Sequence, residues 1–476
     1  MDLWYIAVFA LGALLYSALL PARWRGWALL GASIVAVYRL QPPSPVRYVD
    51  FILPTVTLLL CLFVWWLARA PQQKATRADG ITLAVIAALV VGLSLTRYLI
   101  PELRPTASRA PDTLVIVVAL GALAAVGALL WRLLRGWRSL LTAGIGLIGL
   151  LFVVLKTEAL ATILSAALRD FAGQDPTRAN AADLTWLGFS YVAFRLIHTL
   201  RERQMSKLPT LGLRDYMTYV IFFPALTAGP IDRAERFVKD MGTLAETRLF
   251  AAPRLVEGGG RIAVGLLKKF VLADSLALFA LNTANAEQAV SAPALWLLLY
   301  AYALRLFFDF SGYSDIAIGI GLWLGVRLPE NFDRPYLKSN LAAFWQSWHI
   351  TLSSWLRFYV FSPLSRALLM RKVPAAAAVF AAQMLTMALI GLWHGVSWGF
   401  VVWGLWHGAG LFAHKLWSDR TRKAYLRLGQ YPRLKTVWTL TGSALTFHYV
   451  VLGWVWFALP DITQGARVFG RLFGLP

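Results

Sequence analysis

Long runs of apolar residues follow one another along most of this chain, separated by short polar stretches. A helix needs about 20 apolar residues to cross roughly 30 Å of hydrocarbon. Uncharged runs of about that length lie at 3–22, 51–68, 113–131, 139–155, 373–393 and 436–460, and shorter or interrupted runs lie at 26–38, 81–96, 261–280 and 289–304. The pattern predicts an all-α polytopic membrane protein with about eleven to thirteen membrane segments.

Composition supports a membrane location and excludes an ordinary soluble domain. Of the 476 residues, 58% are hydrophobic and only 15% are charged, with a mean hydropathy of +0.61. The net charge of +22 is spread over the loops, which is typical of a protein facing anionic lipid and unlike the basic face of a nucleic-acid binder. The loops after the first, third and fifth segments together carry more Lys and Arg than those between them, so the positive-inside rule predicts an extracytoplasmic N-terminus.

Polar residues divide the chain into three parts of one integrated membrane domain. Residues 1–168 hold few polar groups within their apolar runs and are predicted to be scaffold helices. Residues 169–415 carry polar and charged groups inside apolar runs, which protein or a water-filled cavity must satisfy, so this part is predicted to build an enclosed chamber. Residues 416–476 are predicted to be a loop and a last membrane helix. The one cysteine, Cys61, lies in an apolar run; we expect a buried free thiol and neither a disulfide nor a metal site.

Two histidines stand in apolar, Trp-rich sequence: His349, in the run 345–355, and His394, within Gly-Leu-Trp-His-Gly at 391–395. A titratable ring is costly to hold where water is scarce unless it is paired or used, so each is a candidate site residue, with simple packing as the alternative. The same five letters recur at 404–408, but the offset would place His407 on another face of a continuous helix.

Residues 341–360 mix polar groups with three tryptophans and are predicted to form one amphipathic helix. Trp345, His349, Leu352 and Leu356 are spaced by four, three and four residues and therefore share one helical face. An interfacial or obliquely inserted helix that carries His349 towards the protein interior is the simplest interpretation. A helix lying on the membrane surface is the alternative.

Five motifs together resemble the membrane-bound O-acyltransferase family, within it the bacterial branch that includes the alginate O-acetylation membrane subunit and the teichoic-acid D-alanylation membrane protein. The likeness covers about residues 185–415 and keeps the family's order and spacing. The motifs are Phe222-Phe-Pro224 leading to Gly229-Pro-Ile-Asp-Arg233, Phe308-Asp-Phe-Ser-Gly-Tyr-Ser-Asp315, Leu328-Pro-Glu-Asn-Phe332 with Arg334-Pro-Tyr336, Phe344-Trp-x-x-Trp-His349-x-x-Leu-Ser353, and Gly391-Leu-Trp-His-Gly395.

The resemblance implies that residues 169–415 are the catalytic core, with interfacial and re-entrant helices around a funnel-like chamber. It also implies an enzyme that moves an acyl group from a cytoplasmic thioester to an acceptor at or beyond the outer face. In that family the histidine matching His394 is taken as catalytic, and the one matching His349 lies close to the reaction path. The motif at 229–233 is closer to the D-alanylation branch and the motif at 328–332 to the polysaccharide-acetylation branch, so both remain open.

The chain departs from the family pattern after His349. The family usually continues with Arg-Asp-Tyr and then Pro-Leu-Gly-Gly, whereas this chain has Arg357-Phe358-Tyr359 and Pro363-Leu364-Ser365-Arg366. The missing Asp removes a carboxylate near the site. This change bears on the partner surface and the acceptor more than on the transfer chemistry, because both histidines remain.

Acyl transfer to a hydroxyl needs a base, and a neutral imidazole, with an ordinary pKa of about 6.5, suits that task. We expect His394 to be the general base, His349 to orient or polarise a reactant, and transfer to be direct, with a covalent acyl-histidine as the alternative. Candidates for stabilising the oxyanion are Trp393, Trp398, Ser353 and Asn331. Further predicted substrate contacts are Trp345, Trp348, Arg357, Asp309 and Tyr313, although Asp309 and Asp315 are more simply explained as partners of Arg305 and of backbone groups.

We expect no metal and no tightly bound cofactor. The donor is expected to be acetyl-coenzyme A or a phosphopantetheine thioester on an acyl-carrier protein, and its phosphates would be drawn to a basic mouth. Arg334, Lys338 and Arg357 flank the His349 segment and can line such a mouth, although basic residues at membrane borders also reach for lipid headgroups.

The leading hypothesis is a multi-pass enzyme of the bacterial cytoplasmic (inner) membrane that acetylates, or similarly acylates, a cell-envelope polysaccharide or other glycan. A periplasmic partner acyltransferase or an acyl-carrier protein would assist it. D-alanyl transfer to a teichoic-acid-like polymer is the alternative within the family. A transporter or flippase would predict internal repeats, which the sequence does not show, and a structural scaffold would tolerate loss of both histidines. We interpret the other histidines as packed or interfacial residues: His198, His407, His414 and His448.

Overall fold

A computed structural model describes residues 2–69, 73–100, 102, 105–133, 139–459 and 461–475. All regular elements in these ranges are helical, which confirms the predicted all-α class. The chain packs as two compact units, one of Met1–Gly259 with Ala317–Leu328 and one of Gly260–Ile316 with Pro329–Pro476. The three-part division at residues 168 and 415 was drawn from polarity, not packing, and stays a prediction.

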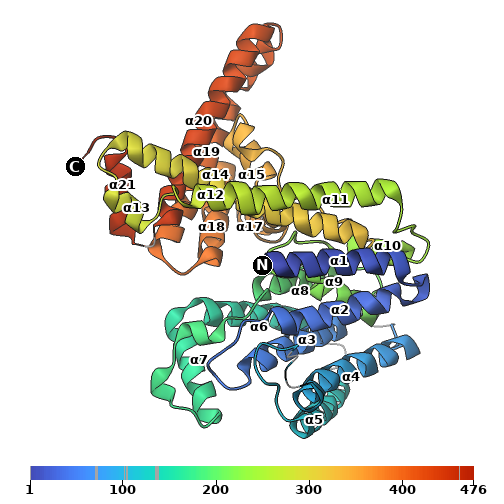
Figure 1. Cartoon of the computed structure of the whole chain (residues 1–476). Coiled ribbons are helices and arrows are strands. Elements are labelled where there is room, and N and C mark those ends of the chain that lie inside the picture. Colours follow the sequence, from blue (N-terminus) through green and yellow to red (C-terminus); the bar gives the residue numbers. More distant parts are fainter. Residues whose placement is uncertain are drawn as a thin grey trace. The chain divides into compact units, whose positions relative to one another are not determined.

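The first unit is built mainly from ten helices that follow one another along the chain (Figure 1). They are α1 (Leu3–Leu19), α2 (Arg25–Leu40), α3 (Val49–Ala68), α4 (Arg77–Leu99), α5 (Thr113–Leu133), α6 (Ser139–Lys156), α7 (Glu158–Phe171), α8 (Phe189–Gln204), α9 (Leu213–Ile221) and α10 (Ala234–Thr243). Two further helices, α11 (Ala252–Leu266) and α14 (Ala292–Trp323), have residues in both units.

The second unit contains the two histidine motifs. Its remaining helices are α12 (Asp274–Ala277), α13 (Thr283–Gln288), α15 (Leu341–Ser347), α16 (Ile350–Leu356), α17 (Ser362–Met370), α18 (Ala375–His394), α19 (Trp398–Leu428), α20 (Pro432–Ala458) and α21 (Ile462–Arg471). Two π-helical turns, Leu267–Ala273 and Arg357–Phe361, continue α11 and α16. Such turns are wider than α-helix and are frequent at functional sites.

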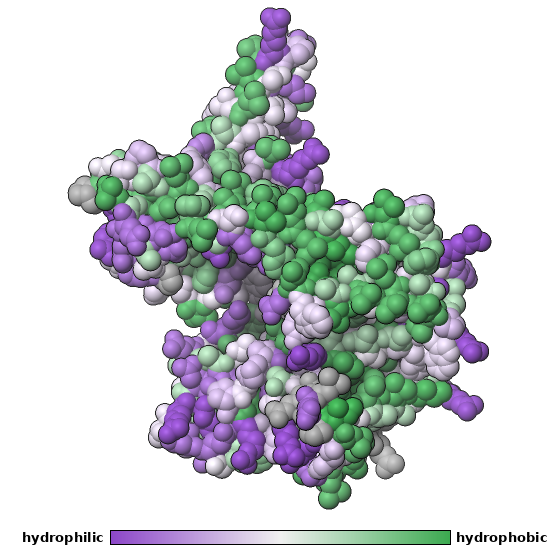
Figure 2. All heavy atoms as spheres, in the orientation of Figure 1, coloured by the Kyte–Doolittle hydropathy of each residue, from purple (hydrophilic) through white to green (hydrophobic). Residues whose placement is uncertain are grey.

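Five helices in the described part of the chain are long and apolar enough to cross a membrane: α3, α4, α14, α18 and α20. The pair α6 and α7, bent by 93° at their junction, makes a sixth candidate. The expected eleven to thirteen segments are not confirmed as full spans, because several apolar runs fold as short or broken helices. Hydrophobic residues nevertheless cover much of the visible surface along α1 and α11 (Figure 2), as expected for helices facing lipid. Pro460, which ends the last run, lies outside the described residues.

Buried polar groups organise the first unit around α8. The Arg195 guanidinium is 1% exposed and donates to the carbonyl oxygens of Val220 and Ala225, each at 2.8 Å, and of Pro230 at 3.4 Å. His198, three residues further along α8, accepts a hydrogen bond from the backbone N–H of Ala234 at 3.2 Å. Both side chains hold the motif at 229–233 in place, so the packing role predicted for His198 is confirmed. Cys61 is a buried free thiol, as expected.

In the second unit, α18 and α19 form a close hairpin that depends on glycine. A Cβ atom at Gly404 would lie 2.3 Å from the carbonyl oxygen of Met387, and one at Gly391 would lie 2.1 Å from that of Phe400. Both distances are far below van der Waals contact and involve backbone atoms. The two helices therefore approach each other as closely as their backbones allow, as small residues permit in membrane helix pairs.

We expect Gly404→Ala to lower the free energy of unfolding by about 1–3 kcal/mol, because a methyl group must push the two backbones apart. The measurement is thermal unfolding of the full chain in detergent. Gly92→Ala is the matched control: nothing lies within 4 Å of a Cβ at this position of α4, and alanine is the better helix former. Equal unfolding temperatures for Gly404→Ala and wild type would contradict the close packing.

Candidate active site

The segment that carries His349 is two short helices, not the single amphipathic helix predicted for 341–360. α15 ends at Ser347 and α16 begins at Ile350, and His349 between them has a φ of 44°, in the left-handed region. Residues other than glycine adopt this conformation at a cost, and such strain gathers at functional sites. The break places His349 at the head of α16 and does not leave it on one continuous face with Trp345.

Residues 331–333 hold this break from both sides. The carbonyl oxygen of Asn331 accepts from the N–H of Ile350 at 2.9 Å, and the N–H of Asp333 donates to the carbonyl oxygen of Ser347 at 3.0 Å. These bonds satisfy backbone groups that a helix break would otherwise leave unpaired. The strained conformation of His349 is therefore imposed by a neighbouring segment and not by its own helix.

The side chain of Asn331 fixes the proton on His349. Asn331 is 1% exposed, and its Oδ1 accepts from the backbone N–H of Thr351 at 3.3 Å and from the Thr351 hydroxyl at 2.9 Å. A backbone N–H can only donate, so the accepting atom is the amide oxygen. His349 Nδ1 lies 3.1 Å from the same oxygen and must donate to it. The lone pair of the neutral ring is consequently on Nε2.

The Nε2 atom of His349 is buried and has no hydrogen-bond partner among the described residues. His349 itself is 3% exposed and lies outside the helices that are long enough to span the membrane. Burial lowers its pKa from 6.5 to about 3, and the neighbouring His394 acts in the same direction. The ring therefore stays neutral at ordinary pH and presents a hydrogen-bond acceptor.

Trp393 stands between the two histidines. Its ring centroid lies 6.2 Å from that of His349 and 4.5 Å from that of His394. The rings of Phe457 and Trp403 also pack edge-on against His394, with centroids 4.7 Å and 5.5 Å from that of the histidine. The structure thus brings together the two histidines that the sequence singled out.

A cavity of about 260 Å³ lies beside this pair, within the second unit. Its wall includes Gln383, Met387 and Ile390 of α18, which share one helical face with His394, one turn further on. Ser353 and Leu356 of α16 also line it, and they stand one and two turns beyond His349. The cavity therefore lies against α16 and α18, which follow His349 and end at His394, and neither histidine is itself among its lining residues. The remaining lining residues are Ala342, Trp345, Gln346, Ser354, Arg357, Phe361, Thr386 and Leu411.

The predicted site residues fall into two groups. Close to the histidines or the cavity are Asn331, Trp345, Ser353, Arg357 and Trp393. Trp348 packs among Phe332, Phe344 and Trp454 instead, and Trp398 is 72% exposed at the start of α19. Of the basic pair, Arg334 is exposed and Lys338 is bound to Asp333 at 2.7 Å. Tyr313 is buried within α14.

The acidic residues of α14 form ion pairs, as the structural explanation required, but with other partners than Arg305. Asp309 pairs with Lys269, and Asp315 accepts from Arg261 at 2.5 Å and from Lys268 at 2.7 Å. All three cations belong to α11 and its π-helical turn, so the pairs fasten α11 to α14. Among the described residues no group of His, Cys, Asp and Glu is arranged to hold a metal ion.

Sequence reasoning missed several groups at the site. Phe310 packs edge-on against His349 at 4.7 Å, and Thr351 shares the oxygen of Asn331. Phe310 lies within the motif at 308–315 and Thr351 within the motif at 344–353, so the family resemblance could have pointed to both. Trp403 and Phe457, which wall in His394, had no such signal, because α19 and α20 reach the site only through the fold.

Comparison with known proteins gives the class of this fold and site. The model of MBOAT, the membrane-bound O-acyltransferase family, matches residues 141–441. The chain belongs to this family and is a multi-pass membrane protein.

Its curated relatives include acetyltransferases and D-alanyltransferases. The chain is 34% identical over 288 residues to the protein named probable alginate O-acetylase AlgI of Pseudomonas syringae pv. tomato, covering 60% of this chain and 51% of that protein. It is 34% identical over 265 residues to the peptidoglycan O-acetyltransferase of Helicobacter pylori, covering 55% of this chain and 47% of that protein. It is 32% identical over 286 residues to the teichoic acid D-alanyltransferase of Streptococcus thermophilus, covering 58% and 68%. The chain spans about half the length of the first two.

We expect Asn331→Leu to destabilise the protein, because the leucine side chain cannot accept from His349 or Thr351. Each buried donor left unpaired costs about 1–3 kcal/mol. Thermal unfolding of the full chain in detergent measures the loss. The control is Ser314→Ala, which removes only the 3.4 Å hydrogen bond that the Asn331 amide nitrogen donates to the Ser314 hydroxyl. Similar unfolding temperatures for the two variants would show that the oxygen of Asn331 does not hold His349.

Proposed function

We propose that this protein is an O-acyltransferase of the bacterial cytoplasmic membrane. It moves an acetyl or similar small acyl group from a cytoplasmic thioester to a hydroxyl of a cell-envelope glycan or of a partner acyltransferase. The observation that carries the proposal is that a neutral His349, with its acceptor atom Nε2 directed by Asn331, and His394 pack on the same Trp393, next to helices that line a cavity. Acyl transfer needs a base and an oriented hydroxyl at one place.

In the proposed reaction, the hydroxyl oxygen of the acceptor attacks the thioester carbonyl carbon while His394 takes the hydroxyl proton. Collapse of the tetrahedral intermediate breaks the carbon–sulfur bond, and the proton passes from His394 to the departing sulfur, leaving a free thiol and an ester. The attacking hydroxyl has a single proton, which goes to His394, so His349 can accept a hydrogen bond at Nε2 from a neighbouring hydroxyl of the acceptor and so orient the attacking one. Neutral imidazoles suit both tasks, since a protonated ring accepts neither a proton nor a hydrogen bond.

The cavity is suited to the donor. It is lined by apolar groups such as Met387 and Ile390 near the histidines and by Gln383 and Arg357 further away. Arg357 follows His349 by eight residues, or about 12 Å of helix. A donor with a thioester at one end and phosphates at the other matches this polarity, because a guanidinium binds phosphate well. Arg357 is therefore proposed to bind the phosphates of coenzyme A or phosphopantetheine; Arg334 and Lys338 do not line the cavity.

The names of the relatives support small-acyl transfer to envelope polymers and leave the acyl group open. D-alanyl transfer from a carrier protein remains the alternative within the family, since a teichoic acid D-alanyltransferase is among the relatives. Membership of an acyltransferase family leaves the transporter hypothesis without a supporting observation.

We expect His394→Ala to reduce acyl transfer at least about 100-fold, the usual contribution of a positioned base. The assay follows labelled acetyl from acetyl-coenzyme A onto glycan, lipid or protein in vesicles containing the full chain. His414→Ala, on α19 outside the site, is the control and should retain activity. Full activity of His394→Ala would refute its role as base. Absence of label even with wild type, followed by transfer from a D-alanyl carrier, would favour the alternative donor.

We expect Arg357→Ala to raise the KM for acetyl-coenzyme A about tenfold and to leave kcat nearly unchanged, because only ground-state binding of phosphate is lost. Acetyl-pantetheine, which lacks the phosphates, should show the same KM with Arg357→Ala as with wild type. For acetyl-coenzyme A, the KM of Arg357→Lys should lie between those of wild type and Arg357→Ala. An equal rise in KM for both donors would mean that Arg357 shapes the cavity and does not bind phosphate.

A further inference from the structure

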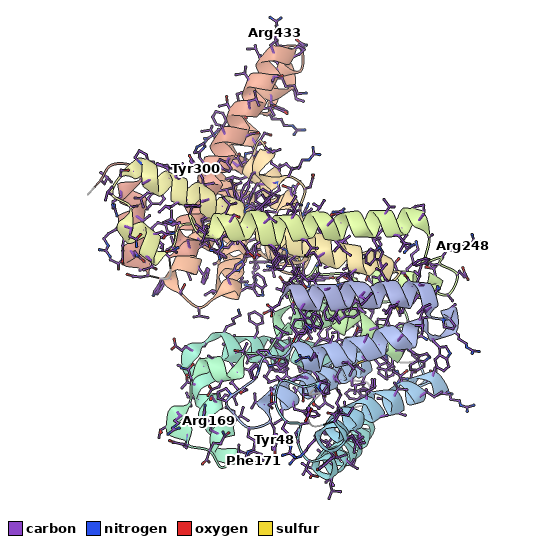
Figure 3. All side chains as sticks on the ribbon, viewed as in Figure 1. Tyr48, Arg169, Phe171, Arg248, Tyr300 and Arg433 are labelled. Atoms are coloured by element: carbon purple, nitrogen blue, oxygen red, sulfur yellow. The ribbon has the colours of Figure 1, made fainter. Side chains whose placement is uncertain are left out.

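The helices α19 and α20 extend beyond the rest of the second unit. Phe380, near the start of α18, packs on Phe412 of α19 with ring centroids 4.9 Å apart, and α18 begins at Ala375. Beyond the start of α18, α19 and α20 run on together (Figure 1), and the rings of Trp417 and Trp438 stack across the pair with centroids 6.2 Å apart. The arm, defined here as residues 418–435, is the part beyond this stack. Figure 3 shows Arg433 at its tip.

The arm is long enough to reach past the lipid headgroups. From Trp438 to Ala458, α20, one of the helices long and apolar enough to cross a membrane, spans about 30 Å, the thickness of the hydrocarbon core. Trp417 of α19 stacks on Trp438 at this end of the span. The remaining residues of α19, to Leu428, add about 16 Å of helix, whereas the headgroup layer on each side is only about 5–8 Å thick. The stacked tryptophans sit at the level where aromatic belts mark the membrane interface. The tip of the arm therefore stands in water.

The charge of the arm is almost entirely positive. It contains one acidic residue, Asp419, which already binds Lys415 at 2.5 Å. Its cations have no acidic partner in the described part of the chain, and all are exposed. They are Arg420, Arg422, Lys423, Arg427, Arg433 and Lys435. Figure 2 shows hydrophilic residues at the tip.

Exposed apolar groups lie among these cations. Leu426 is 68% exposed and Tyr431 57%, and Tyr425 and Leu434 are also exposed. Aromatic residues beside arginine are the composition of protein interfaces, whereas a helix that only repels other charges has no need of them. Dense Lys and Arg beside a membrane span also place this end of α19 in the cytoplasm.

We propose that the arm is a docking surface for an acidic soluble protein of the cytoplasm. The unpaired cations provide the charge complementarity that steers and orients such a partner, and the exposed tyrosines and leucines provide the apolar contact. A protein is favoured over anionic lipid because the arm projects along its helix axes past the headgroups. A lipid-binding helix lies in the interface plane. The proposal does not depend on the acyl-transfer chemistry.

The test is photo-crosslinking in the bacterium that encodes the chain. A benzophenone amino acid replaces Tyr425 in the full-length protein, and adducts are identified by mass spectrometry. We expect one main adduct, a soluble protein with a strongly negative net charge. The triple change Arg420→Glu, Arg422→Glu and Arg427→Glu should reduce its yield at least about tenfold through like-charge repulsion.

The matched control changes the same three arginines to lysine, which keeps the charge and should keep the adduct. The Glu variant must insert and elute as wild type does on size exclusion; if it does not, an Arg→Gln triple replaces it, with the same loss of adduct expected. Each of three outcomes would overturn the proposal: adducts confined to phospholipid, no protein adduct, or a protein adduct whose yield is unchanged by the charge reversal.

Discussion

One amide oxygen, Oδ1 of Asn331, is the interaction on which the candidate site depends. It receives the ring of His349 together with the backbone N–H and hydroxyl of Thr351. In a region without water these donors would otherwise remain unpaired. Together with the backbone bonds of Asn331 and Asp333, these bonds keep a residue other than glycine in a left-handed conformation, and that conformation turns the chain so that α16 starts at the histidine. The cavity wall and the contact with Trp393 follow from this starting point.

The broad fold could be predicted because membrane helices obey a simple rule of composition. Lipid accepts any apolar run of sufficient length, so α3, α18 and α20 follow from hydropathy alone. The two histidines could be found for a related reason: a ring that is costly to bury is conspicuous in apolar sequence. Motif order then predicted the family, and the match over residues 141–441 confirms it.

The remaining features depend on contacts distant in sequence. The break at His349 is invisible to periodicity, because Trp345, Leu352 and Leu356 are buried whether the helix is continuous or not; it is imposed by residues 331–333. The partner of Asp309 is Lys269, 40 positions away. The number of membrane segments stays a prediction for a similar reason, since several apolar runs form helices that are short or bent.

The π-helical turn Arg357–Phe361 has a consequence for how such proteins diverge. A π turn is an α-helix with one residue inserted, so loss of a single residue there leaves the helices on both sides intact. It would rotate the following side chains of α17, as far as Met370, by about 100° and replace Phe361 in the cavity wall by a neighbour in the sequence. The turn between α17 and α18 would take up the change before His394 is reached. Single-codon insertions and deletions at this turn can thus remodel the cavity wall around Phe361 across a lineage while both histidines stay where they are.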